Sequence, residues 1–171
     1  TGTISENLRN LQFLEVLNMK TNHFNGTIPK GMGDMPDLRY MWLDNNEITG
    51  TMPVLTAAQV ARLEEVTASN NMLHGSVPMS LEVPENLELR LSKIDLSHNH
   101  LTGTLSNLLG YLHTIKYLDF SNNMFTGTIF PTIEYMTKLE VVRMNDNLLE
   151  GAIPKFPHNS KTLQLQGNDL S

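Results

Sequence analysis

The segment LDFSNNMFTGTIFP at residues 118–131 recurs with small changes along the chain, and this recurrence constrains the fold more than any other feature. Related segments are LNMKTNHFNGTIP from Leu17, MWLDNNEITGTMP from Met41, VTASNNMLHGSVP from Val66, IDLSHNHLTGTLS from Ile94 and VRMNDNLLEGAIP from Val142. Self-similarity at a fixed period is typical of stacked structural repeats. One such repeat cannot bury its apolar face alone, so neighbouring repeats must share a core. Function is therefore expected on a surface that stacking creates.

An asparagine marks the same place in every copy, and in the first six copies a glycine follows it four residues later. A buried asparagine side chain can satisfy the backbone groups that a sharp turn exposes. We therefore predict that these residues line up as a structural ladder through the stack. At steps of 24, 25, 28, 24, 24 and 21 residues, they are Asn22, Asn46, Asn71, Asn99, Asn123, Asn147 and Asn168.

Apolar residues lie five and three positions before the asparagine and two and six positions after it. Around Asn123 they are Leu118, Phe120, Phe125 and Ile129. The pair before the asparagine alternates at period two, which predicts a short strand with both side chains directed inward. Stacked copies of this strand should pair in parallel, about 4.8 Å apart, as one continuous sheet.

The LxLxxNxL pattern and its LTGTIP-like tail resemble the plant-type leucine-rich repeat. That subclass is known from leucine-rich-repeat receptor-like kinase ectodomains, receptor-like proteins and polygalacturonase-inhibiting proteins. The resemblance covers essentially the whole chain and implies an α/β repeat solenoid. The expected form is a right-handed superhelix with a concave parallel β-sheet, short second strands on the convex flank, and 3-10 or helical turns.

A single solenoid over residues 1–171 is expected, with a partial repeat 1–10, repeats at about 11–34, 35–58, 59–86, 87–111, 112–135 and 136–156, and a partial repeat 157–171. The alanine-rich segment 56–66 should be the most helical convex connection. The longest step places an insertion at 79–92, expected as a longer loop or helical turn. The family usually carries paired-cysteine caps and this chain has no cysteine, so we expect a fragment that lacks both caps.

Composition and motifs exclude several function classes. A net charge of −6 argues against general nucleic-acid binding, which needs a surplus of lysine and arginine. There is no nucleophile motif, phosphate loop or metal-ligand spacing, so we expect no enzyme, no cofactor and no metal. His98 and His100 flank Asn99, but they have no obvious third ligand.

Residues between and beside the inward pair should face outward on the concave sheet, where a ligand can contact them. Aromatic residues on a rigid exposed strand are suited to anchor a peptide or protein, although single exposed aromatics are also ordinary. Asp95 and Asp119 are neighbours that repel each other and could hold a basic side chain or a cation; the alternative is that they only follow the repeat consensus. The predicted ligand-binding residues are Tyr40, Trp42, Asp44, Thr67, Asp95, Tyr117, Asp119 and Arg143.

Two features belong to the opposite flank. The triplet Thr-Gly-Thr begins at Thr1, Thr49, Thr102 and Thr126, and stacking would turn it into a flat threonine array similar to those of ice-binding β-solenoids. The segment Asn25-Gly26-Thr27 is an N-glycosylation sequon, which makes Asn25 a predicted glycan site if the protein is secreted.

The resemblance implies an extracellular or lumenal, non-enzymatic binding module. The main expectation is part of a cell-surface receptor ectodomain that recognises a peptide, protein or glycan, with a co-receptor or larger assembly as a further partner. Membrane attachment would come only from segments outside this chain. The alternatives are a secreted inhibitor of a foreign hydrolase, an ice-binding solenoid that uses the threonine array, and a structural scaffold subunit.

Overall fold

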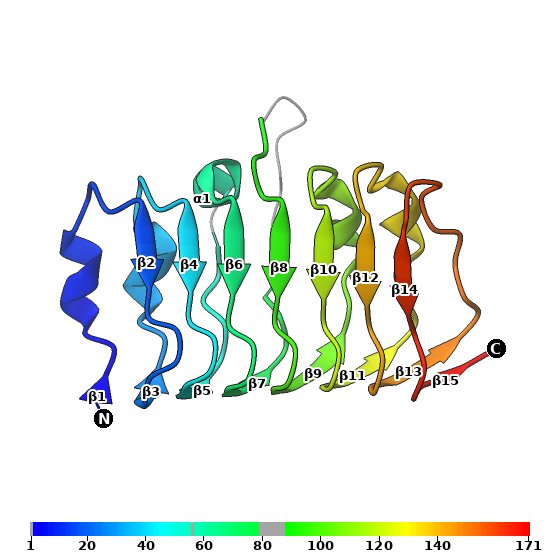
Figure 1. The fold of residues 1–171 in the computed structure, drawn as a ribbon, viewed down its shortest axis with the longest axis horizontal. Coiled ribbons are helices and arrows are strands. Elements are labelled where there is room, and N and C mark those ends of the chain that lie inside the picture. The colour runs from blue at the N-terminus through cyan, green and yellow to red at the C-terminus, as the bar shows by residue number, and fades with distance from the viewer. Residues whose placement is uncertain (1, 56, 79–87) are drawn as a thin grey trace.

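The computed structural model describes residues 2–55, 57–78 and 88–171, and each repeat in these ranges supplies strands to two parallel sheets (Figure 1). The seven-stranded sheet contains β2 (Val16–Asn18), β4 (Tyr40–Trp42), β6 (Glu65–Thr67), β8 (Lys93–Asp95), β10 (Tyr117–Asp119), β12 (Val141–Arg143) and β14 (Thr162–Gln164). The eight-stranded sheet contains β1 (Gly2–Thr3), β3 (Phe24–Thr27), β5 (Glu47–Gly50), β7 (Met72–Gly75), β9 (His100–Thr104), β11 (Met124–Gly127), β13 (Leu148–Gly151) and β15 (Asp169–Leu170). The predicted α/β repeat solenoid is confirmed.

Short helical turns lead from a strand of the eight-stranded sheet to the next strand of the seven-stranded sheet. They are η1 (Glu6–Asn10), η2 (Lys30–Asp34), α1 (Ala57–Arg62), η3 (Asn107–Tyr111) and η4 (Pro131–Tyr135). Serine caps begin two of them, because the Ser5 and Ser106 hydroxyls each accept a backbone N–H at 3.2 Å. The α1 helix confirms the helical prediction for segment 56–66. Thr1, Thr56 and most of the predicted insertion at 79–92 lie outside the described residues.

The middle residue of each strand in the seven-stranded sheet points into the solenoid. From β2 to β12 this residue is buried, and Leu118 in β10 has no exposed surface. Leu163 in β14, the strand at the C-terminal edge of the sheet, is 45% exposed. The apolar core is therefore built from every repeat together, as the alternating pattern predicts.

The asparagine ladder ties consecutive repeats to one another. Asn71 shows the arrangement: its Nδ2 donates to the carbonyl oxygens of Leu43 at 3.0 Å, Ala68 at 3.2 Å and Ser69 at 3.2 Å. Its Oδ1 accepts the backbone N–H of Ile48 at 3.0 Å. Leu43 and Ile48 belong to the preceding repeat, so one buried side chain closes its own turn and holds the neighbouring one.

The residue before each ladder asparagine has a left-handed backbone. Its φ lies between +53° and +56° in the first six copies, at Thr21, Asn45, Asn70, His98, Asn122 and Asp146. Asparagine and aspartate tolerate this conformation better than most residues, and they fill four of the six places. The same tight turn thus follows each strand of the seven-stranded sheet from β2 to β12.

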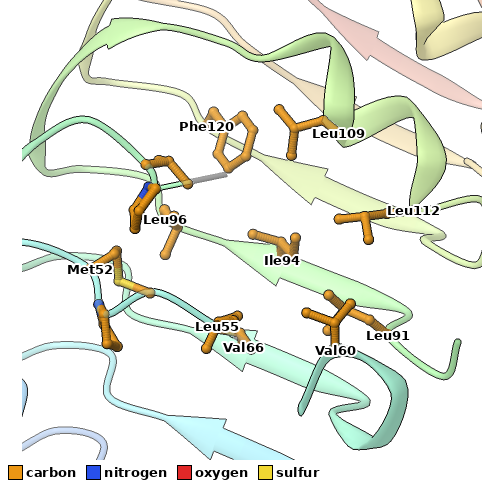
Figure 2. Close-up of a pocket in the computed structure, with 13 residues that line it drawn as sticks. Met52, Leu55, Val60, Val66, Leu91, Ile94, Leu96, Leu109, Leu112 and Phe120 are labelled. Atoms are coloured by element: carbon orange, nitrogen blue, oxygen red, sulfur yellow. The ribbon is translucent and has the colours of Figure 1, made fainter. Parts of the chain in front are cut away.

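An apolar cavity of about 40 Å³ lies inside the solenoid near its middle (Figure 2). Val66 and Ile94 from neighbouring strands line it, together with Val60, Met52 and Phe120. Small-molecule sites are usually several hundred Å³ and carry a few polar groups. This cavity is a packing defect, and a binding site must be sought on the surface.

Candidate functional site

The outer face of the seven-stranded sheet is the surface on which the sequence predictions converge. In each of its strands the first and third residues point outward, and the strands pair in register along the stack. β4 carries Tyr40 and Trp42, whereas β8 carries Asp95 and β10 carries Tyr117. The fold therefore brings these residues from three repeats onto one continuous face.

A first aromatic cluster (Lys20, Tyr40, Trp42, Glu65) lies at the β4 end of this face. The rings of Tyr40 and Trp42 are tilted against each other with centroids 5.4 Å apart, and the Lys20 Nζ lies 5.0 Å from the Trp42 ring centroid. Trp42 Nε1 donates to Glu65 Oε2 at 2.9 Å. The Tyr40 hydroxyl donates to Glu64, which raises the pKa of Tyr40. Both half-exposed rings are thus held in place before any ligand arrives.

A second aromatic cluster (Lys93, Tyr117, Asp119, Arg143) lies around β10. The Tyr117 ring has Lys93 Nζ at 4.9 Å and the Arg143 guanidinium at 5.4 Å from its centroid. Arg143 Nη1 donates to the Tyr117 hydroxyl at 2.5 Å, and that hydroxyl donates to Asp119 Oδ2 at 3.0 Å. Burial and the nearby charges of Asp119 and Asp95 raise the pKa of Tyr117 to about 12, so its hydroxyl remains a neutral donor.

The two clusters lie on the same row of outward-facing positions. Tyr40 pairs with Glu65, Glu65 pairs with Lys93, and Lys93 pairs with Tyr117. Three strand steps therefore separate the tyrosines, which corresponds to about 14 Å at the usual spacing of parallel strands.

Three aspartates on this face share one hydrogen-bond arrangement. In each, Oδ1 accepts both the backbone N–H and the hydroxyl of one serine, at 2.6 to 3.2 Å. The pairs are Asp44 with Ser69, Asp95 with Ser97, and Asp119 with Ser121. In the last two pairs the serine is two residues further along the same repeat, whereas Asp44 reaches into the next repeat.

The prediction that Asp44, Thr67 and Asp119 are exposed is wrong. Thr67 is 1% exposed, Asp119 4% and Asp44 6%. Thr67 occupies the position that an aspartate has in the two following repeats. Asp44 from the preceding repeat therefore binds the serine in place of that aspartate, and it also accepts the Thr67 hydroxyl at 2.5 Å. Asp119 is covered by Tyr117 and Arg143. These three residues support the binding face, and the partly exposed residues of the predicted set are Tyr40, Trp42, Asp95, Tyr117 and Arg143.

The sequence reasoning missed the charged residues that hold the aromatic rings. Lys20, Glu65 and Lys93 occupy outward positions of the same strands and turns, but their charges did not single them out. The signal was available, because a cation one strand away from an aromatic residue is within reach of its ring.

Replacing Asp44 with asparagine is expected to lower the free energy of unfolding by about 1–2 kcal/mol at pH 7, through weaker hydrogen bonds and a lost ion pair with Lys20. Burial opposes ionisation of Asp44, but hydrogen bonds with Thr67, Lys20 and Ser69 outweigh it and lower the pKa. Such an acid stabilises the fold above its unfolded pKa of about 3.9, and this stabilisation is lost as pH falls through the folded value. In urea unfolding, the difference between the wild type and Asp44→Asn should shrink below about pH 4.

The Asp95→Asn variant is the matched comparison, because the pKa of Asp95 is shifted in the opposite direction. Burial and the charges of Asp119 and Asp44 raise the pKa of Asp95, despite its hydrogen bonds from Ser97. The fold thus disfavours the ionised form, a cost that is present at pH 7 and disappears as pH falls below the unfolded pKa of about 3.9. We expect Asp95→Asn to be at least as stable as the wild type at pH 7. Equal destabilisation by the two variants would refute this difference between the carboxylates.

Known proteins with the same repeats give this arrangement its context. The family model for the Leucine Rich Repeat matches residues 90–112 and 114–136. Receptor-like protein 18 from Arabidopsis thaliana is 30% identical over 131 residues, which cover 66% of this chain and 16% of that protein.

Solved structures match over almost the whole chain. The plant peptide hormone receptor RGFR1 in complex with RGF2 has a TM-score of 0.90 and 27% identity, and PEPR1–AtPEP1 has a TM-score of 0.91 and 29% identity. Each match covers 99% of this chain and about a quarter of the receptor chain, at 27% and 24%. A plant ice-binding protein shares the fold at a TM-score of 0.75 and 20% identity, with 99% of this chain and 62% of that chain covered.

The chain is a leucine-rich-repeat protein. Its repeats are of the plant type, and its relatives are plant receptor-like proteins and receptor kinases. The chain spans less than a fifth of the length of those curated relatives, for example 17% of the calmodulin-binding receptor kinase CaMRLK of Arabidopsis thaliana. The kinase relatives match only through this repeat region, a kind of module that is not catalytic.

Proposed function

We propose that this chain is the ligand-binding part of a plant-type receptor-like protein and that it binds a peptide or protein segment on the outer face of the seven-stranded sheet. The observation that carries the proposal is the pair of aromatic clusters, whose rings are half-exposed and already fixed by charged neighbours. Fixed aromatic side chains lose little entropy on binding and are common hot spots of interfaces. The proposal is further supported by RGFR1 with RGF2, a related plant receptor whose ligand is a peptide hormone.

The spacing of the clusters favours an extended peptide. An extended chain advances about 3.3 Å per residue, so the distance of about 14 Å between the tyrosines corresponds to four residues. A peptide that crosses the strands would place one anchor side chain against the first cluster and another, four residues away, against the second cluster. A folded protein partner could present the same two anchors from a loop.

An extracellular location, a co-receptor and membrane anchoring through other segments are part of the same proposal. Among the helices in the described part of the chain, none has the length and apolar character needed to cross a membrane. Asn25 lies on β3 with its side chain exposed, and we propose that its sequon carries a glycan in a secretory compartment. This site lies on the eight-stranded sheet, away from the aromatic clusters.

Trp42→Ala should weaken ligand binding by about thirtyfold, because a well-placed aromatic anchor is worth about 2 kcal/mol. The test uses linear peptides selected on the wild-type protein from a random phage-displayed library, with calorimetric affinities for each variant. Tyr111→Ala is the control, since Tyr111 is 57% exposed on η3, outside the sheet face. Peptides that bind Trp42→Ala as tightly as the wild type would refute the proposal. A loss of about 3 kcal/mol in unfolding free energy would mean that Trp42 is a core residue instead.

A second candidate function is ice binding, and one observation favours it. An exposed row of hydroxyl-bearing residues runs along the eight-stranded sheet, one per repeat, at Thr3, Thr27, Thr51, Ser76, Thr104 and Thr128. Each of the six side chains packs against the glycine of the next repeat; a Cβ on Gly127, for example, would lie 3.0 Å from Thr104 Cγ2. These contacts fix the orientation of the row.

The row makes ice binding testable with one substitution. Thr104→Tyr should abolish thermal hysteresis if the row binds ice, because the ring would stand out of the flat hydroxyl surface. Thr137→Tyr, an exposed threonine outside both sheets, is the control. Absence of thermal hysteresis in the wild type, or an equal value in Thr104→Tyr, would refute this candidate.

A further inference from the structure

The three aspartates of the binding face differ at their second carboxylate oxygen. Asp44 Oδ2 accepts the Thr67 hydroxyl and lies 3.0 Å from Lys20 Nζ. Asp119 Oδ2 accepts the Tyr117 hydroxyl at 3.0 Å and lies 3.3 Å from Arg143 Nη1. In both, the second oxygen therefore accepts one hydroxyl and forms an ion pair with one basic side chain.

Asp95 lacks both of these partners. Its Oδ1 accepts from Ser97 like the others, but no residue in the described ranges donates to its Oδ2 or forms an ion pair with it. This oxygen is not fully buried, because Asp95 is partly exposed on the outer face. Two of the three aspartates thus have a hydroxyl donor and a basic group at Oδ2, whereas Asp95, the middle one, has neither among the described residues.

Within the described residues, none of the side chains beside Asp95 forms a direct ion pair with it. Glu65 and Lys93 face each other on paired strands, a position in which opposite charges usually form an ion pair. Instead, Glu65 accepts from Trp42 on one side and Lys93 lies over Tyr117 on the other. The basic group closest in sequence is therefore engaged by an aromatic ring.

We propose that Asp95 determines specificity by accepting the side chain of a lysine or arginine from an extended peptide, between anchors at the two aromatic clusters. This inference rests on the proposed peptide-binding function and adds the charge of the ligand. Asp95 lies two strand steps from Trp42 and one from Tyr117. The basic residue therefore falls within the four-residue span between the anchor residues.

A basic side chain fits this position better than a metal ion does. One open carboxylate oxygen cannot supply the six to eight oxygen ligands that calcium prefers. Within the residues that the structure describes, no three His, Cys, Asp or Glu side chains gather to hold a metal. A cationic side chain needs only this one oxygen, and its aliphatic stem can lie along the aromatic rings on either side.

The test compares peptide selection on three proteins: the wild type, Asp95→Asn and Glu150→Gln. Asparagine can keep the hydrogen bonds from Ser97, and Glu150→Gln makes the same charge change on β13 of the other sheet. Peptides selected on the wild type and on Glu150→Gln should share a lysine or arginine between two anchor residues. Peptides selected on Asp95→Asn should have no basic preference at that place.

The best wild-type peptide is then synthesised with its basic residue replaced by norleucine for lysine or citrulline for arginine. The neutral peptide should bind the wild type about tenfold more weakly, and both peptides should bind Asp95→Asn equally. Two outcomes would overturn this inference and leave the proposed peptide binding intact. Selected peptides could depend on Trp42 but show no basic preference, or the neutral replacement could weaken binding equally on the wild type and on Asp95→Asn. If no selected peptide depends on Trp42, the proposed function fails as well.

Discussion

Replacing Asn99 with alanine is expected to lower the free energy of unfolding by about 4 kcal/mol, because four buried backbone groups lose their partner at once. Asn99 Nδ2 donates to the carbonyl oxygens of Ala68 at 2.9 Å, Leu96 at 3.1 Å and Ser97 at 3.1 Å. Its Oδ1 accepts the N–H of Leu73 at 3.0 Å. Each buried group left without a hydrogen bond costs about 1–3 kcal/mol, and water in the new space recovers part of that cost.

The matched control is Asn22→Ala, at the first position of the same ladder. Asn22 is exposed, and within the described residues its Nδ2 donates to the carbonyl oxygens of Met19 and Lys20 in its own turn alone. Water can replace those bonds, so we expect a loss of about 1 kcal/mol or less. Urea unfolding monitored by circular dichroism measures both variants. Similar losses for Asn22 and Asn99 would show that the ladder does not act through burial.

Phe120→Ala is expected to destabilise the protein by about 4 kcal/mol, in the range typical of large aromatic truncations in a core. Phe120 has no exposed surface, and its ring packs against Phe125 with centroids 5.5 Å apart. It also forms part of the wall of the 40 Å³ cavity, as Figure 2 shows. Removing the ring therefore enlarges an existing void, which makes collapse of the surrounding side chains less effective.

Binding of a small apolar molecule distinguishes an open cavity from a collapsed core. Engineered apolar cavities of about 150 Å³ remain dry and bind xenon or benzene. We expect benzene to raise the stability of Phe120→Ala and to leave that of the wild type unchanged. Tyr135→Ala, which removes an aromatic ring that is 59% exposed, should cost less than about 1 kcal/mol. A comparable loss for both variants would contradict the assigned core.

The amino-acid sequence alone determined the architecture. The period, the alternating apolar pair and the asparagine at one fixed place were enough to predict stacked parallel strands and a ladder. Each repeat must bury the same apolar face against its neighbours and satisfy the same exposed backbone groups at its turn. The placement of Tyr40, Trp42 and Tyr117 on one outward face followed from the period-two alternation of strands. Such features depend on spacing within one repeat, which the sequence displays directly.

Tertiary structure alone decided how charges are distributed between repeats. Sequence spacing treats Asp95 and Asp119 as equivalent, yet among the described aspartates Arg143 forms a direct ion pair with Asp119 and not with Asp95. Likewise, Asp44 is buried because the smaller Thr67, 23 residues away, leaves room for the Asp44 carboxylate, which accepts the Thr67 hydroxyl. These outcomes depend on which side chain each neighbouring repeat presents and how far it reaches. The open Oδ2 of Asp95 is therefore a property of the stack, since the basic groups that pair with Asp44 and Asp119 come from neighbouring repeats.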